Sequence, residues 1–426
     1  MTDSLLRAPT ALGRALEALF LLHAALLPIS IAAGQVWAYL IAVVTIVAWA
    51  RGSLDPDVRR AGLAFPILLF ASAALFSAFV GLRPDTALRK MDRLLLAATA
   101  IAAPWIAGRS AGFSAPDLIR RLISAFLIGC SAKAAYDLVR IPLKYWIAVH
   151  AHEAALSAGG TSSFPSFYSF GNMRDPQFYA AAICIALALG LARTPAFRPR
   201  LLTVSAALCS AALIIHFKRG AWASLLIALL GMALLTRRWR MLAILAVIAA
   251  AVLQFPMVQE RLGQLRHELS PEAGGRVALW VRVAPSLFRD YPLGIGWRSV
   301  RHEDLLDRGA PVQNRLNHLH NNVLHVRLET GWFGLLAWLW WMGSAAALMV
   351  RASRAAARAA SDLRGPALGV LCAFAAVHAN GVVEYNFGDA EIFMLMNLLA
   401  GLGAALWVHL AQTEEAGCSL AARATR

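Results

Sequence analysis

The chain has 426 residues, of which 59% are hydrophobic and only 15% are charged. Soluble globular domains carry about 25% charged residues, so this composition excludes a chain that is surrounded by water. The net charge is +16, but the basic residues lie in short clusters between apolar runs, without the interleaved aromatic residues that stack on bases. We therefore expect a lipid bilayer and no nucleic acid as partner.

The apolar runs predict an all-α protein. About 20 helical residues are needed to cross a bilayer core of about 30 Å. Runs near this length predict a polytopic membrane helix bundle of about 12 transmembrane helices, near residues 15–33, 36–50, 61–82, 93–108, 117–139, 177–192, 201–216, 220–236, 240–255, 321–350, 366–383 and 390–411. The first run is too long for a cleavable signal peptide, so we expect a membrane helix there. Lys133 and Asp137 interrupt the fifth run near its end.

Basic residues predict the orientation of the bundle. They fill the connections that a cytoplasmic N-terminus would place inside, around residues 51–60, 109–121, 193–200, 237–240 and 351–364. The short outer turns at 34–35 and 384–389 contain no Lys or Arg, as the positive-inside rule requires. We expect both termini in the cytoplasm.

Two outer segments exceed a simple turn, one from about Arg140 to Pro176 and one from about Pro256 to Leu319. The second contains amphipathic stretches such as Val258–Leu269. Loops of this length in a compact protein usually carry function. We divide the chain into a transmembrane bundle with helices 1–9 (1–255), a helical periplasmic loop domain (256–320), and a part with helices 10–12 and a cytoplasmic tail (321–426).

The cysteines predict neither a disulfide nor a zinc site. Four of the five lie in apolar runs, and Cys418 lies in the C-terminal tail. No two of them share an outer loop, so they have no arrangement that would bridge or bind a metal.

Two outer segments carry arginines that suit a phosphate group. Arg219 lies in the stretch His216–Trp222, where one predicted helix meets the next, and Arg276 lies in the long outer segment. A guanidinium presents a fixed fork of donors that matches a phosphate or pyrophosphate. Snorkelling to lipid phosphates is the alternative for Arg219, and an ordinary solvated arginine is the alternative for Arg276. Together the two would form a clamp on a pyrophosphate.

A third segment holds three histidines within eight residues, His318, His320 and His325. Asn321 or Asn322 is expected to cap the long helix that starts there. His320 would then stand at the positive end of that helix, which disfavours the imidazolium form and leaves a neutral ring to act as a base. A histidine that merely caps the helix at the interface is the alternative, and three histidines beside a polar loop favour the base.

The motifs occur in one order and together resemble the O-antigen ligase family, within a superfamily that includes O-antigen polymerases and bacterial protein O-oligosaccharyltransferases. The resemblance covers roughly the C-terminal half of the chain. Where family members often have Ser-Arg-Gly, this chain has Lys-Arg-Gly, which keeps the arginine and adds a cation. The matching motifs are Lys-Arg-Gly-Ala-Trp at 218–222, Gly-Arg-(x)3-Trp at 275–280, Tyr-Pro-Leu-Gly-Ile-Gly at 291–296, His-Asn-Asn-Val-Leu at 320–324 and Glu-Thr-Gly-Trp-Phe-Gly at 329–334.

The resemblance implies roles for individual residues. His320 would be the general base, and Arg219 and Arg276 would hold the pyrophosphate of an undecaprenyl carrier. Further substrate-binding candidates are Lys218, Arg174, Asn321 and His318, with a local ion pair as the alternative for Arg174. Pyrophosphate is a good leaving group, so the site must only neutralise it and deprotonate a sugar hydroxyl; we expect no metal and no cofactor. Direct attack would invert the anomeric carbon. The polar turn with Glu384, Asn386 and Asp389 is expected to be structural.

The implied activity is that of an O-antigen ligase in lipopolysaccharide biosynthesis. It would move O-antigen polysaccharide from undecaprenyl pyrophosphate to a lipid A–core sugar hydroxyl, on the periplasmic face of the bacterial inner membrane. An O-antigen polymerase and a protein O-oligosaccharyltransferase would use the same donor; the moderate outer loop and the lack of a large soluble C-terminal domain favour the ligase. A lipid transporter or flippase is the non-enzymatic alternative, and it would not need His320. The sugars, the acceptor hydroxyl and the oligomeric state stay open.

Overall fold

The structure, a computed structural model, describes residues 11–51, 60–108, 114–158, 163–256, 258–260, 262–263, 275–310 and 317–424. Every regular element in these ranges is a helix, which confirms the all-α prediction. The bundle helices are α1 (Ala11–Leu26), α2 (Ile31–Ala50), α4 (Ala64–Val80), α6 (Ala98–Gly108), α7 (Ala115–Ser157), α8 (Asp175–Leu191), α9 (Pro199–Ile215), α10 (Arg219–Thr236), α11 (Trp239–Leu253), α16 (Asn322–Arg358), α17 (Arg364–Asn380) and α18 (Ala390–Ala424). Shorter helices between them are α5 (Pro84–Leu88), η1 (Met91–Ala97), η2 (Phe167–Ser169), α13 (Arg276–Ala278), η3 (Leu279–Val283), α14 (Ala284–Asp290) and α15 (His302–Leu306).

The helices are those of a polytopic membrane protein. Five described helices are long and apolar enough to cross a bilayer, namely α2, α7, α10, α16 and α18. Each of the twelve predicted segments overlaps a bundle helix, and α4, α8, α9 and α11 are shorter apolar helices. Many large apolar side chains of these helices are exposed, for example Phe65 and Val247, as lipid contact requires.

The first outer turn was predicted at 34–35, which is wrong. The chain turns at residues 27–30, and Gly34 lies inside α2. Ser30 caps α2 by accepting a hydrogen bond from the Ala33 amide. Gly34 is a packing residue, because a Cβ at this position would lie 3.0 Å from a methyl carbon of Leu27. Its lack of a side chain lets α1 and α2 approach closely.

The outer segment predicted from Arg140 to Pro176 is half helical. Helix α7 continues without interruption from Ala115 to Ser157, through Lys133, Asp137 and even Pro142. The charged residues do not end the helix because each of them is paired. Past Pro142, residues 143–157 hold no glycine and no further proline, so nothing stops the helix.

The centre of the bundle consists of α8, α17 and the part of α18 up to Leu410, whose surfaces are almost entirely buried. Small residues allow this close packing, as is usual between membrane helices. A Cβ at Gly369 of α17 would lie 2.9 Å from the Cα of Ile185 in α8, and one at Gly401 of α18 would lie 2.8 Å from the Cβ of Ala103 in α6. Helix α18 continues to Ala424, so the part of the predicted tail between residues 412 and 424 is helical.

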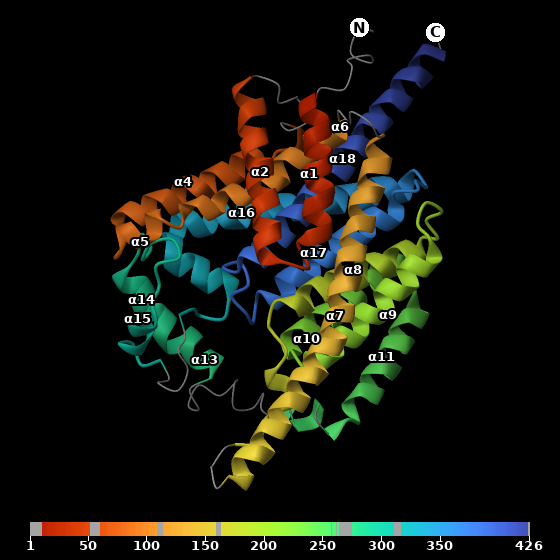
Figure 1. The fold of residues 1–426 in the computed structure, drawn as a ribbon. Helices are drawn as coiled ribbons and strands as arrows, with labels where there is room; N and C mark the ends of the chain where they lie inside the picture. Colours follow the sequence, from red (N-terminus) through yellow and green to blue (C-terminus); the bar gives the residue numbers. More distant parts are fainter. Residues whose placement is uncertain are drawn as a thin grey trace.

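Helices α13, α14 and α15 form a compact unit beside α5, on the opposite side from the start of α1 and the end of α18 (Figure 1). We call it the outer unit, after the predicted outer segment to which it belongs. The unit has its own apolar core, which includes Leu279, Leu287 and Leu305. Arg83 at the start of α5 forms an ion pair with Asp304 of α15 at 2.6 Å, which anchors the unit to the bundle. Most of the predicted stretch Val258–Leu269, Gly274, and the basic residues at 52–59 and 109–113 lie outside the described residues.

Helix α16 is broken at Gly331, where φ is 69° and ψ is −171°. The break leaves carbonyl groups of the preceding turn without the amide partners that a continuous helix would supply. The amides of Ile295 and Gly296 donate to the carbonyls of Leu328 and Glu329, at 2.9 and 3.1 Å. The motifs at 291–296 and 329–334 therefore meet backbone to backbone and attach the outer unit to α16.

Gly331→Ala is predicted to destabilise the protein strongly. The φ/ψ pair of Gly331 lies in a region that essentially only glycine adopts, and a Cβ there would meet the backbone carbon of Leu293 at 2.6 Å. We expect a loss of at least about 1–3 kcal/mol of unfolding free energy from backbone strain alone.

Thermal unfolding of the purified protein in detergent measures this loss as a lower midpoint. Gly343→Ala is the matched control in the same helix, since no atom lies within 4 Å of a Cβ placed at Gly343. Equal midpoints for the two variants would contradict the assigned role of Gly331.

Candidate functional site

The start of α16 is joined to the turn between α17 and α18. Asn321 caps the helix, because its Oδ1 accepts the Leu324 amide at 3.0 Å, and its Nδ2 donates to the carbonyl of Val382 at 2.8 Å. The predicted asparagine cap is confirmed at Asn321. Asn322 instead donates to Asn386 at 2.6 Å and accepts the amide of Phe387 at 3.0 Å. These contacts fix the 381–389 turn against the residues that precede α16.

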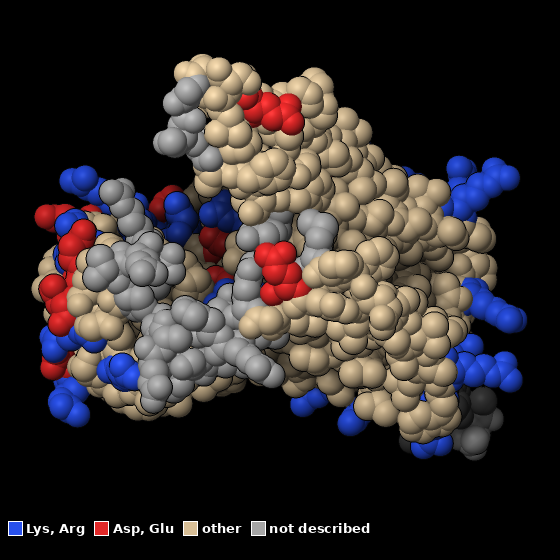
Figure 2. Space-filling model, turned by 90° about the horizontal axis from the view of Figure 1, so that it is seen from below, with Lys and Arg blue, Asp and Glu red and all other residues tan. Residues whose placement is uncertain are grey.

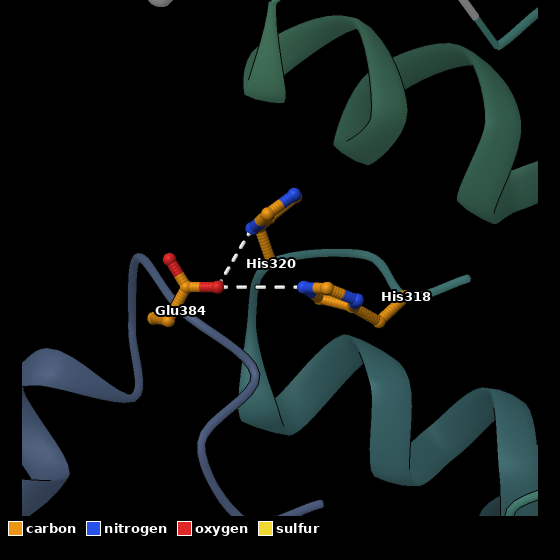
Figure 3. A group of neighbouring side chains, drawn as sticks. All are labelled: His318, His320 and Glu384. Atoms are coloured by element: carbon orange, nitrogen blue, oxygen red, sulfur yellow. Dashed lines mark hydrogen bonds and ion pairs between the residues drawn. The ribbon is translucent and has the colours of Figure 1, made fainter. Parts of the chain in front are cut away.

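Glu384 of that turn is the centre of a cluster formed by three segments that lie far apart in the sequence. Its Oε1 accepts from His320 Nδ1 at 2.8 Å and faces His318 Nε2 at 3.4 Å (Figure 3). Its Oε2 accepts from Arg276 at 3.1 Å, and the same guanidinium donates to the carbonyl of Val383 at 2.6 Å. Three of the predicted site residues thus converge on a carboxylate that was predicted to be structural.

The carboxylate determines which nitrogen of His320 carries the proton. Burial alone would raise the pKa of Glu384, but the hydrogen bonds from His318 and His320 and the charge of Arg276 lower this pKa well below its usual range. An ionised carboxylate can only accept, so Nδ1 of His320 is the protonated nitrogen. The other ring nitrogen, Nε2, points away from Glu384 in Figure 3 and keeps its lone pair. Burial lowers the pKa of His320 despite the opposing effect of Glu384, so the ring is neutral near pH 7.

The start of α10, which carries Arg219, borders the same turn from another direction. Arg219 is the first residue of α10, directly after Lys218, and both side chains are partly buried. A Cβ at the next residue, Gly220, would lie 3.5 Å from the side chain of Val383 and 3.1 Å from that of Asn380. Since Val383 also accepts from Arg276, the start of α10 and Arg276 border one turn. The N-terminus of an 18-residue helix adds its own attraction for anions there.

Residues 204–339, about a third of the chain, match the protein-family model described as O-antigen ligase. The chain contains an O-antigen ligase domain. The match includes Arg219, Arg276 and His320, and it confirms the resemblance drawn from the motifs. The matched domain indicates a membrane enzyme of the O-antigen ligase and polymerase type, a family whose activity is the transfer of lipid-linked polysaccharide. No curated protein matches the chain.

The turn that presents Arg219 in the O-antigen ligase domain rests on a buried charge network. His216 donates through Nε2 to Asp137 at 3.1 Å, and both side chains are fully buried. Asp137 also accepts from Tyr179 at 2.6 Å, from Arg140 at 2.8 Å and from Lys133 at 3.1 Å. Four donors on one carboxylate compensate for its burial among apolar helices. The lysine and aspartate at an i,i+4 spacing in an apolar run were the sequence signal of this network.

A polar cavity of about 910 Å³ adjoins the cluster, and His318 and Glu384 contribute to its wall. Acidic and basic side chains are visible in the hollow between the two parts of the molecule in Figure 2. Arg174 also lines the cavity, and it forms ion pairs with Asp389 at 3.1 Å and Glu391 at 2.8 Å. The local ion pair expected as the alternative for Arg174 is therefore present. Lys218, Arg219, Arg276, His320 and Asn321 are not part of the described cavity wall.

The cavity wall contains a second histidine–carboxylate pair, His325 and Glu329, which the sequence did not reveal as a pair. His325 faces Glu329 at 3.2 Å, and Tyr385 donates to the other oxygen of Glu329 at 2.8 Å. The amide of Leu319 donates to Nδ1 of His325 at 3.3 Å, so this ring carries its proton on Nε2. His325 is thus held in the opposite tautomer to His320, and its lone pair is already used by the backbone.

Asp137→Asn is predicted to destabilise the fold. The amide leaves Arg140 and the buried His216 without their anionic partner, and the loss of one member of a buried pair costs about 3–5 kcal/mol. A clearly lower thermal midpoint in detergent is the expected result. Asp362→Asn is the matched control, because Asp362 is exposed and pairs with Arg120 at 3.4 Å. A variant as stable as this control would show that the network contributes little.

Proposed function

We propose that the protein is an O-antigen ligase, which transfers O-antigen polysaccharide from undecaprenyl pyrophosphate to a sugar hydroxyl of lipid A–core. The proposal rests mainly on one observation: Glu384 holds His320 in the tautomer of a base and holds Arg276 beside it. The family match supports the reaction class. The site would face the periplasm, with both termini in the cytoplasm and about twelve helices in the membrane.

In this mechanism the acceptor hydroxyl gives its proton to Nε2 of His320 as its oxygen attacks the anomeric carbon. The bond from that carbon to the pyrophosphate oxygen breaks, and the configuration inverts. Glu384 stabilises the imidazolium that forms, as the carboxylate of a catalytic triad does. A positioned base of this kind contributes about 10²–10⁴-fold to the rate.

The departing pyrophosphate would be bound by Arg219 and Arg276, with Lys218 as an additional cation. Arg276 uses two of its five N–H donors for Val383 and Glu384, so three remain for phosphate oxygens. His318 would contact sugar from the cavity wall, and Arg174 would add charge there. Asn321 uses both polar groups of its side chain in the cap and the turn, so we assign it a positioning role.

The lipopolysaccharide profile of a deletion strain tests the proposal. The strain receives the wild-type gene, His320→Ala or the control His150→Ala, an exposed histidine of α7, and carrier-linked polymer is measured in parallel. We expect long polymer to accumulate on the carrier while lipid A–core stays bare, with rescue by wild type and control only.

Other results would select another function. Single repeat units on the carrier would indicate a polymerase, and loss of protein glycans with intact lipopolysaccharide would indicate a protein O-oligosaccharyltransferase. Full rescue by His320→Ala would overturn the proposed base. Glycosidic bond formation by the isolated protein in detergent would exclude a function as transporter alone.

Glu384→Gln is predicted to lower the turnover number by about 10²–10⁴-fold, because the amide can donate to Nδ1 and so favours the wrong tautomer of His320. Glu303→Gln, an exposed change in the outer unit, is the control. The measurement is transfer by purified protein from a carrier-linked donor. A drop of less than tenfold would contradict the role of Glu384.

The pH profile gives a separate prediction. Because burial lowers the pKa of His320 from 6.5, the neutral base persists at neutral pH and the rate falls only on the acid side, below about pH 6.5. Glu384 raises the pKa of His320, so its replacement by Gln should move this acid limb to still lower pH. An acid limb that stays in place or moves upward in Glu384→Gln would contradict the coupling between the two residues.

A further inference from the structure

Two groups of described side chains have the composition of a metal site, and their surroundings separate them. In one, ligand atoms of Asp137, Asp175 and His216 lie within 4.8 Å of one another. A lysine already occupies the cation position there, since Lys133 Nζ lies 2.7 Å from Asp175 and 3.1 Å from Asp137. This group therefore carries no metal proposal.

The other group consists of His318, His320 and Glu384, whose ligand atoms also lie within 4.8 Å of one another. One nitrogen of each ring is directed at the same carboxylate oxygen, Oε1 (Figure 3). Arg276 binds the other oxygen, Oε2, so no described cation contacts Oε1. The three side chains are only 14–26% exposed, but His318 and Glu384 line the cavity, which gives an ion a path of entry.

We propose that His318, His320 and Glu384 form a binding site for Zn²⁺ that switches the catalytic base off. Two imidazoles and one carboxylate are a frequent ligand set of zinc sites that keep an open position. With bonds of about 2.0–2.2 Å, neighbouring ligand atoms around a tetrahedral zinc lie about 3.4 Å apart. The observed 3.4 Å between His318 and Glu384 matches this separation, and the 2.8 Å between His320 and Glu384 must lengthen. Mg²⁺ and Ca²⁺ prefer oxygen ligands and would bind poorly here.

The charge of Arg276 decides what kind of zinc site this is. Its guanidinium lies 3.1 Å from Glu384 and repels a divalent cation. A tightly held structural or catalytic zinc would not be expected beside it. The proposal is therefore a reversible inhibitory site, which fills when free zinc rises and empties when a chelator removes it.

Inhibition follows from the tautomers of His320, and this step rests on the proposed function. Without zinc, Nδ1 carries the proton and Nε2 is the free acceptor. When zinc binds Nδ1, a neutral ring must carry its proton on Nε2, so the proton moves from Nδ1 to Nε2 through solvent and none is released overall. The nitrogen that would accept the proton of the acceptor hydroxyl is then already protonated, and Glu384 binds metal instead of stabilising an imidazolium.

Zinc binding is tested first, without any transfer reaction. Tag-free protein in detergent is titrated with Zn²⁺ against a chromogenic chelator, for wild type, His318→Ala, His318→Gln, His320→Ala and the control His150→Ala. We expect one site in wild type and control, weakened at least about 10–100-fold in each site variant, since even second-shell changes cost this much in metal sites. Absorption of bound Co²⁺ reports tetrahedral coordination. An unchanged affinity in the site variants overturns the proposal.

Inhibition is tested on the same proteins by measuring transfer against free Zn²⁺, each variant relative to its own zinc-free rate. His318→Ala and His318→Gln should need at least about tenfold more zinc for half-inhibition, and a chelator should restore the wild-type rate. Inhibition of wild type and His318 variants at the same zinc concentration overturns the switch. Specific zinc binding by a protein without transferase activity would refute the proposed function and leave the metal site in place. Transferase activity without specific zinc binding would refute the metal site and leave the proposed function in place.

Discussion

One carboxylate organises the candidate site of this protein. Glu384 lies in the turn between α17 and α18, and it binds Arg276 from the outer unit and His320 from the start of α16. It does so while largely buried, where an unpaired carboxylate would be costly. The position of the turn therefore depends on its ion-pair and hydrogen-bond partners, and the same contacts fix the positions of His320 and Arg276.

A similar constraint explains the interior of the bundle. Apolar helices offer no solvent to a charged side chain, so Asp137 is surrounded by four donors from α7, α8 and the end of α9. This arrangement serves the site indirectly, because His216 belongs to the network and lies three residues before Arg219. Stability of the membrane part and placement of Arg219 thus depend on the same group of residues.

Backbone hydrogen bonds hold the outer unit to α16, in addition to the ion pair between Arg83 and Asp304. At the break of α16 the carbonyls of Leu328 and Glu329 accept the amides of Ile295 and Gly296. The unit carries Arg276 at its first residue, so the hydrogen bonds at the break also help to fix where that guanidinium meets Glu384. Glycines 294 and 331 are required for the close approach, since both have positive φ and a Cβ at either would meet backbone atoms.

The sequence by itself determined the class of protein, the approximate positions of the helices and the residues whose side chains suit catalysis or binding. Apolar length and charge placement are local properties, so all twelve predicted segments overlap observed helices. The motifs with Arg219, Arg276 and His320 were also local, and the family match over 204–339 agrees with them. An asparagine cap at Asn321 or Asn322 followed from residue type alone, and the structure places it at Asn321.

Only the tertiary structure decided which of these residues work together. Glu384 lies 64 residues from His320 and 108 from Arg276, and nothing local distinguishes it from the structural Asn386 of the same turn. The turn at 27–30 and the extension of α7 to Ser157 were missed because glycine and charged residues suggest ends of helices when their packing partners are unknown. Whether a glycine ends a helix or lets two helices touch, and whether a buried charge breaks a helix or is paired, depends on contacts between distant segments.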